Sequence, residues 1–382
     1  MTEDYIRLGL RLGRHVEGLV DSYYGPSELK EEVDAEPLRE PPALVADAER
    51  LLEELDGDDQ RTRWCRAQLV GLQTVARKLT GEELSFGDEV ERCYGVRPRR
   101  TSEAVLEATH AALDDALPGR GSLAERYQRW RESQVVPPEK LGPVLTDVAE
   151  ELRARTADLF GLPEGESYEL QLVTNEPWSA YNYYEGKLRS RIAVNTDVAI
   201  ATNFVTELMA HELYAGHQTE HSWKEQLLYR ERGQAEASIL MIGTPESLIA
   251  EGIAELATEM VLDDEDAFAA EILGEHGIDY DADLARRVKA VRRPLARASD
   301  NAALMIYEDG ATENEARVYM KRQALMSDRR ATQAMKFIVD PMWRSYVTTY
   351  EDGYELCKTW VAGDTGRFKR LLTEQLTPAD LA

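Results

Sequence analysis

The stretch ATNFVTELMAHELYAGHQTEH (residues 201–221) joins an apolar helical stripe to a cluster of histidines and glutamates. The stripe is formed by Ala201, Phe204, Val205 and Leu208, at the spacing of one helix face. Continuing that spacing places His211 and Glu212 on the inward face, where an unpaired charged group is costly. A bound metal ion would remove that cost. The pattern therefore predicts a helix, capped at its start by Thr196 or Asp197, whose last residues bind a metal.

The first two histidines of this cluster, His211 and His217, are six positions apart. Zinc hydrolases of the H-E-x-x-H type use histidines four apart, because those share a helix face. The residue four positions after His211 is Ala215, which cannot bind a metal. On a regular helix, a residue six positions on lies about 240° around the axis and ~9 Å along it. We therefore expect a bulge or loop between the two histidines, most easily formed at Gly216.

A second arrangement uses His217, Glu220 and His221, which form the inverted motif H-x-x-E-H. Its two histidines are four positions apart and fit an undistorted helix. It leaves the inward-facing His211 and Glu212 without a role. The residues alone leave both arrangements open.

Either arrangement needs a carboxylate from another segment as a further metal ligand. Thr244 and Pro245 form a typical helix start, and the helix that they begin carries Glu251, Glu255 and Glu259 on one side. We expect Glu251 to be the third ligand and Glu255 to orient a ligating histidine. Glu259 fits the solvated face of the helix. Small residues around Glu251 would allow close helix packing.

Helical periodicity dominates the rest of the chain. The clearest helical segments are residues 43–55, 64–79, 104–117 and 141–159. Residues 168–174 and 188–195 have the pattern of strands and flank an aromatic segment, which indicates a small antiparallel β element. We expect a mostly α, helical bundle-like protein, with a helical portion over 1–165 and a second portion over 166–382. The two portions are expected to form one cooperative unit.

The composition restricts the partners of the protein. With 71 acidic and 45 basic residues the formal charge is −26, which disfavours nucleic acid and anionic membranes. The three cysteines are far apart and suggest neither disulfides nor a thiolate metal site. The first residues lack a signal-peptide pattern, and no 18 apolar residues run together. We expect a soluble cytoplasmic protein, whose oligomeric state the sequence leaves open.

The cluster resembles a bacterial family, the domain-of-unknown-function family 885, which is itself similar to the gluzincin metallopeptidases. Its signature is H-E-x-x-P-G-H-H followed by E-G-W-A. The matching residues are His211, Glu212, Gly216, His217, Glu251, Gly252 and Ala254. Segments 20–26, 177–197, 319–331 and 340–353 also resemble the family. The chain departs from the signature at Ala215, Gln218 and Ile253, which stand where the family has proline, histidine and tryptophan.

The resemblance favours the first arrangement and implies a gluzincin-like fold for residues 166–382. It implies Zn2+ bound by His211, His217 and Glu251, with Glu212 as the general base. The expected activity is hydrolysis of a peptide or small amide.

Positioned donors add to the stabilisation of an oxyanion that a metal supplies. The candidate donors in the C-terminal third are Tyr346, Tyr350, Arg344 and Arg322. Two other functions stay open. One is an inactive homologue that acts as a binding or interaction module, and the other is a metallohydrolase of a non-peptide substrate.

Overall fold

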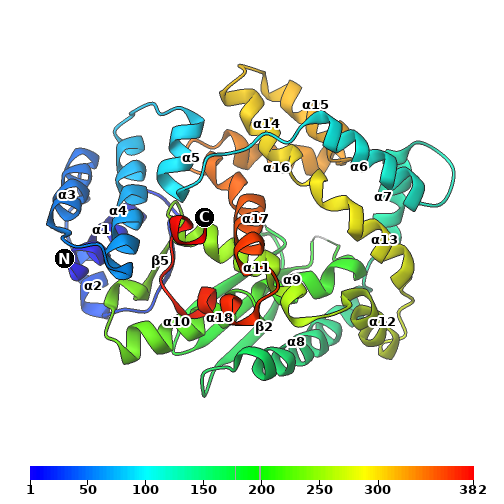
Figure 1. The fold of residues 1–382 in the computed structure, drawn as a ribbon, viewed down its shortest axis with the longest axis horizontal. Coiled ribbons are helices and arrows are strands. Elements are labelled where there is room, and N and C mark those ends of the chain that lie inside the picture. Colours follow the sequence, from blue (N-terminus) through cyan, green and yellow to red (C-terminus); the bar gives the residue numbers. More distant parts are fainter. Residues whose placement is uncertain (177, 198) are drawn as a thin grey trace.

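The computed structural model describes residues 1–176, 178–197 and 199–382, and it shows a mostly helical protein with short strands (Figure 1). The helices before the main sheet are α1 (Thr2–Gly13), α2 (Ser27–Ala35), α3 (Pro41–Glu54), α4 (Gln60–Leu79), α5 (Phe86–Tyr94), α6 (Glu103–Ala116), α7 (Leu123–Ser133) and α8 (Pro138–Phe160). The α-helices after it are α9 (Val205–Glu212), α10 (His217–Lys224), α11 (Pro245–Val261), α12 (Glu265–Glu275), α13 (Ala282–Arg292), α14 (Ala298–Tyr307), α15 (Glu313–Gln323), α16 (Asp328–Val339), α17 (Thr349–Val361), α18 (Thr365–Thr373) and α19 (Pro378–Leu381). The helical segments expected from periodicity are confirmed as α3, α4, α6 and α8. Among the described residues, none of the helices is both long enough and apolar enough to cross a lipid bilayer.

The main sheet consists of β2 (Ser167–Val173), β3 (Ala180–Gly186) and β4 (Arg189–Asn195), with β4 between the other two. The expected antiparallel pairing is present between β3 and β4. The two strands predicted from sequence, β2 and β4, instead pair in parallel. The reason is that the aromatic segment between them forms β3 and reverses the chain direction once more.

A second, two-stranded antiparallel pairing joins β1 (Val20–Tyr23) to β5 (Ile239–Met241). We expected the first 160 residues to be entirely helical, and β1 shows that this expectation is wrong. The pairing ties the N-terminal helices to the segment that leads into α11. The hydroxyl of Ser22 also donates to the carbonyl oxygen of Tyr184 at 2.6 Å, so β1 lies against β3 as well.

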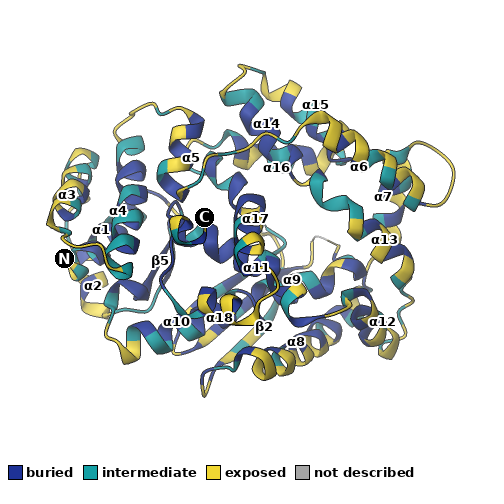
Figure 2. Cartoon of the chain, in the orientation of Figure 1, coloured by how far each residue is buried: buried dark blue, intermediate teal, exposed yellow. Residues whose placement is uncertain are grey.

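An extensive buried apolar cluster lies between α8, α9, α11 and the sheet, with Leu145, Val148, Val205, Leu208 and Ile253 among its members. Figure 2 shows exposed residues mainly on outer helices such as α3, α8 and α12. Burial of these apolar side chains fixes α9 and α11 beside each other.

α11 and α17 pack closely in the middle of the molecule (Figure 1). A Cβ atom at Gly252 would lie 2.3 Å from the carbonyl oxygen of Gly353, so both positions require glycine. The close approach that the sequence suggested around Glu251 is therefore made with α17.

The helix that carries the histidines begins later than expected. Asp197 does not cap it, because the Asp197 carboxylate accepts from the backbone N–H of Asn175 at 2.6 Å. A 3-10 turn, η1 (Thr202–Phe204), precedes the start of α9 at Val205. Phe204, expected inside, is 39% exposed, because the turn rotates it away from the face that carries Val205 and Leu208. The start of α11 after Thr244 is confirmed.

Candidate metal centre

The two histidines lie on either side of a helix break. α9 ends at Glu212 and α10 begins at His217, with a turn between them in which the Tyr214–Ala215 peptide bond is cis. The backbone N–H of Gly216 donates to the carbonyl oxygen of Ala210 at 2.9 Å and closes this turn. The expected irregularity is present, and it changes the direction in which His217 projects relative to a continuous helix.

Replacing Gly216 by alanine should destabilise the protein by about 3 kcal/mol. The added Cβ would lie 2.0 Å from the carbonyl oxygen of His211 and 2.4 Å from that of Ala210, and these are backbone atoms that cannot move aside cheaply. Chemical denaturation of the variant measures the change. The same substitution at Gly274, where no atom lies within 4 Å of the added Cβ, is the matched control and should be neutral or slightly stabilising. A Gly216→Ala variant as stable as the native chain would show that the turn is not as the structure has it.

The break brings His211, His217 and Glu251 together. One ligand atom of each lies within 4.8 Å of the others. Nε2 of His211 is 3.5 Å from Oε2 of Glu251, and Nε2 of His217 is 3.9 Å from Oε1. A tetrahedral zinc ion with bonds of about 2.0–2.1 Å separates its ligand atoms by about 3.3 Å. The observed spacings fit such an ion after a small inward movement of the side chains.

The protonation chemistry of the three groups also fits a cation. Burial lowers the pKa of His211, and burial with the neighbouring histidine rings lowers that of His217 further, so both imidazoles are neutral near pH 7. Burial raises the pKa of Glu251 well above its usual range, and the negative charges of Glu255, Glu212 and Asp21 raise it further. Within the described residues, the Oε2 atom of Glu251 is buried and has no hydrogen-bond partner. A divalent cation would satisfy this oxygen and both imidazoles.

The groups around the cluster hold these side chains in place. The hydroxyl of Tyr346 donates to Oε1 of Glu251 at 2.5 Å and leaves Oε2 free to face His211. Oε1 of Glu255 lies 3.6 Å from Nδ1 of His211, which supports its expected orienting role. Arg293 in turn binds Glu255 at 3.2 Å.

Glu212, the expected general base, is positioned by strand β3. Its backbone carbonyl accepts from the side-chain amide of Asn182 at 2.5 Å. Burial raises the pKa of the Glu212 carboxyl, whereas the backbone N–H of Asn182 and the nearby His211 ring lower it. In the described part of the chain no lysine or arginine is paired with this carboxylate, so it is available to exchange a proton.

The alternative motif lacks an available carboxylate. Glu220 is fully buried and accepts from the ammonium group of Lys224 at 2.6 Å. The ring of His221 lies parallel to that of His217, 5.7 Å away, and contacts Tyr184 on its other side. The group of potential metal ligands that the described residues form does not include His221.

Gln218 stands where the resembled family has a second histidine, and its side chain is turned toward the sheet. The amide nitrogen donates to the carbonyl oxygens of Ser167 and Leu188, each at 3.1 Å, and the amide oxygen accepts from Ser190. The departure at this position therefore changes the contact with the sheet and leaves the three-residue cluster intact.

The candidate donors from the C-terminal third separate into two groups. Tyr350 is 39% exposed and its ring stands edge-on to Tyr346 at 5.6 Å, so it is reachable beside Glu251. Arg344 is instead committed elsewhere, because its guanidinium pairs with the buried carboxylate of Glu89 at 2.6 Å. Arg322 is exposed on α15. Neither arginine belongs to the cluster of His211, His217 and Glu251.

Asp21 and Tyr181 border the centre and were not singled out from sequence. The Tyr181 hydroxyl donates to the Asp21 carboxylate, whose pKa burial raises to about 6. The negative charge of Asp21 in turn raises the pKa of Glu212 and Glu251. The segments that contain Asp21 and Tyr181, 20–26 and 177–197, resemble the family in sequence but indicate no role for either residue.

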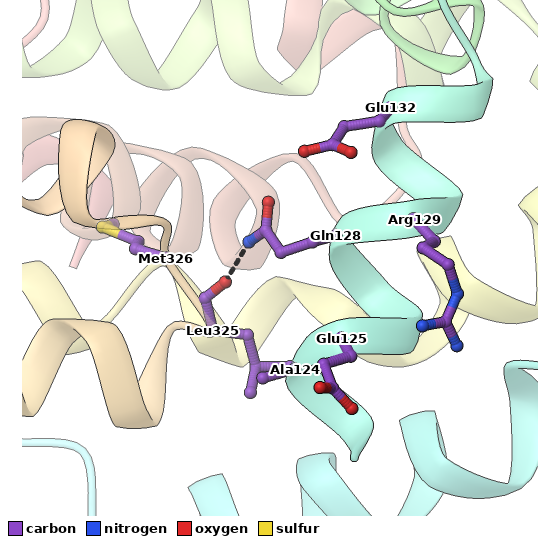
Figure 3. Close-up of a pocket in the computed structure, with 7 residues that line it drawn as sticks. All are labelled: Ala124, Glu125, Gln128, Arg129, Glu132, Leu325 and Met326. Atoms are coloured by element: carbon purple, nitrogen blue, oxygen red, sulfur yellow. Dashed lines mark hydrogen bonds between the residues drawn. The ribbon is translucent and has the colours of Figure 1, made fainter. Parts of the chain in front are cut away.

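A pocket of about 350 Å³ lies apart from the cluster, between α7 and the turn after α15 (Figure 3). Gln128 donates to the carbonyl oxygen of Leu325 at 2.6 Å across it. Its charged side chains, Glu125, Arg129 and Glu132, are exposed on α7 and are explained as a solvated helix face.

Comparison with known proteins gives the fold alone. No protein-family model matches the chain, and no curated protein matches its sequence. A "putative lipoprotein" from Colwellia psychrerythraea is 13% identical with a TM-score of 0.53, over 88% of this chain and 65% of that one. A "putative lipoprotein of unknown function" from Shewanella oneidensis is 11% identical with a TM-score of 0.49, over 92% of this chain and 75% of that one. The chain thus spans less than two thirds of the Colwellia protein, with which it shares its fold.

Proposed function

We propose that this chain is a zinc-dependent hydrolase of peptides or small amides, related to the gluzincin metallopeptidases and to the domain-of-unknown-function family 885. One observation carries the proposal. His211, His217 and Glu251 converge with their ligand atoms within 4.8 Å, and the unpaired carboxylate of Glu212 directly follows the first histidine. This combination of two neutral imidazoles, one carboxylate and an adjacent base is the one that zinc hydrolases use.

The residues have distinct parts in the reaction. Zn2+ bound by the three ligands supplies Lewis acidity toward a carbonyl oxygen and lowers the pKa of a water molecule. The Glu212 carboxylate takes the proton of the attacking water and passes it to the leaving nitrogen. Its pKa, raised by burial, makes the first of these transfers, from water to the carboxylate, easier than it is for an exposed glutamate. Tyr350, with its accessible phenol, is the donor that we assign to the developing oxyanion, while Tyr346 holds Glu251.

Peptides are the substrate class that the surroundings favour. Strand β3, whose Asn182 contacts Glu212, has β4 on one side in the main sheet, and its other edge is contacted by Ser22 of β1 at Tyr184. We propose that the part of this edge before Tyr184 pairs with an extended peptide. Trp178, Tyr181 and Tyr183 lie together on this segment, with ring centroids 4.6–6.3 Å apart, and offer an apolar surface for substrate side chains. Nucleic acid and anionic membranes are not proposed as partners, because the charge is −26.

The test is turnover of a defined mixture of dipeptides to hexapeptides, followed by mass spectrometry, with metal removed by a chelator and zinc then restored. Zinc-dependent appearance of shorter peptides is expected. Turnover confined to esters added in parallel would assign the site to a non-peptide substrate. Stoichiometric zinc with no turnover of either class would favour an inactive homologue.

A cytoplasmic location is part of the proposal. It is supported by Cys65, Cys93 and Cys357, which are buried free thiols.

A further inference from the structure

Asp21 on β1 is a carboxylate without a cationic partner. In the described part of the chain, no lysine, arginine or histidine lies within ion-pair distance of it, and its hydrogen bond comes from the neutral hydroxyl of Tyr181. The residue is of intermediate exposure. A partly buried negative charge in such a position is stabilised when a cation binds.

The position of Asp21 relative to the proposed catalytic base is set by two strands. Ser22, the next residue on β1, donates its hydroxyl to the carbonyl oxygen of Tyr184 on β3 at 2.6 Å. Two residues earlier on β3, Asn182 donates to the carbonyl oxygen of Glu212 at 2.5 Å. The amide oxygen of Asn182, a residue only 6% exposed, has no hydrogen-bond partner within the described residues. Tyr181, which donates to Asp21, is the neighbour of Asn182 on β3, so adjacent positions of one strand contact Asp21 and the backbone of the base.

Among the carboxylates around the centre, Asp21 is the one whose negative charge is not neutralised. Glu255 is paired with Arg293 at 3.2 Å. Glu251 is neutralised when it binds the metal, and Glu212 is neutralised when it takes a proton. A cationic group of the substrate would neutralise the charge of Asp21.

The arrangement of β1 and β3 also limits how far a peptide substrate can extend along β3. A peptide extended along β3 beside Glu212 meets β1 about two residues further on, which is about 7 Å at the rise of a strand. Ser22 makes that contact, and the neighbouring Asp21 on β1 directs its carboxylate to the hydroxyl of Tyr181. A chain end carrying a positive charge fits this position better than a continuing chain.

We propose that Asp21 binds the free ammonium group at the N-terminus of the substrate, so that the enzyme removes residues from the N-terminal end of short, unblocked peptides. The inference rests on the proposed hydrolase function and names its substrate class. Asp21 is a specificity-determining residue in this account.

The test compares trialanine with N-acetyl-trialanine in two measurements. Binding to the metal-free protein is followed by calorimetry, and hydrolysis by the zinc-loaded protein is followed by chromatography. The native protein should prefer the free amine on the order of 10- to 100-fold in both, as expected for a charge-assisted hydrogen bond. In Asp21→Asn the preference should fall to within about 3-fold. The asparagine oxygen can still accept from Tyr181, so the local fold is kept.

Two further variants separate charge from structure. Tyr181→Phe removes the hydrogen bond and keeps the charge, so it should keep the preference for the free amine. Asp34→Asn removes a similar charge from the exposed end of α2 and should also keep the preference for the free amine.

An amine preference in binding that Asp21→Asn abolishes, without hydrolysis of either peptide, would support ammonium binding by Asp21 and reject the hydrolase. Hydrolysis of both peptides at equal rates, or a preference that survives Asp21→Asn, would overturn the inference and leave the hydrolase intact. No difference in either measurement also overturns it.

Discussion

Replacing Glu212 by glutamine is expected to lower kcat for peptide hydrolysis by about 10²- to 10⁴-fold while the bound zinc stays at one ion per chain. Glutamine has nearly the same shape but cannot take a proton from water. The fold should tolerate it, because burial already raises the pKa of this carboxyl and so disfavours its charged form. The measurements are kcat on a single peptide and elemental analysis of the purified variant.

Glu259→Gln is the matched control for this variant, because Glu259 is an exposed glutamate on α11 that pairs with Lys358. It should leave kcat unchanged. A Glu212→Gln variant that keeps its rate within about 3-fold would mean that another group accepts the proton. Loss of zinc together with the rate would mean that Glu212 is a ligand and not the base.

His211→Ala is expected to weaken zinc binding by at least about 100-fold and to abolish zinc-dependent hydrolysis. Removal of a group that only orients a ligand costs 10- to 100-fold in metal affinity, and removal of the ligand itself costs more. Affinity is measured by competition with a chromophoric chelator, and a thermal melt of the metal-free variant shows that it is folded.

His221→Ala separates the two possible ligand sets. His221 lies outside the cluster, and the nearby Glu220 is neutralised by Lys224, so this variant should retain stoichiometric zinc. The His217 ring would lose one stacking neighbour, with a modest effect on affinity. If His221→Ala loses the metal while His211→Ala keeps it, the inverted motif is the zinc site.

Much of the cluster could be predicted from the sequence because its determinants are local. The helical stripe, the impossibility of closing His211 and His217 on a regular helix, and the small residue at Gly216 together predicted a break where one is found. The helix start at Thr244 and Pro245 fixed the face on which Glu251 lies. Local periodicity was sufficient for each of these.

The features that sequence reasoning missed depend on contacts between distant segments. β1 exists because residues 20–23 pair with 239–241, and its own sequence is too short to predict a strand. Asp21 reaches the centre through that pairing and through Tyr181, 160 positions later. Arg344 and Tyr350 looked equivalent in sequence, and only the packing against Glu89 shows that Arg344 points away.

Anomalous diffraction at the zinc absorption edge, from crystals of protein purified in the presence of zinc, tests the central claim most directly. One strong peak should lie within bonding distance of Nε2 of His211, Nε2 of His217 and a carboxylate oxygen of Glu251. A peak bound by His221 and not by His211, or a zinc-saturated crystal with no peak at this position, would contradict the account.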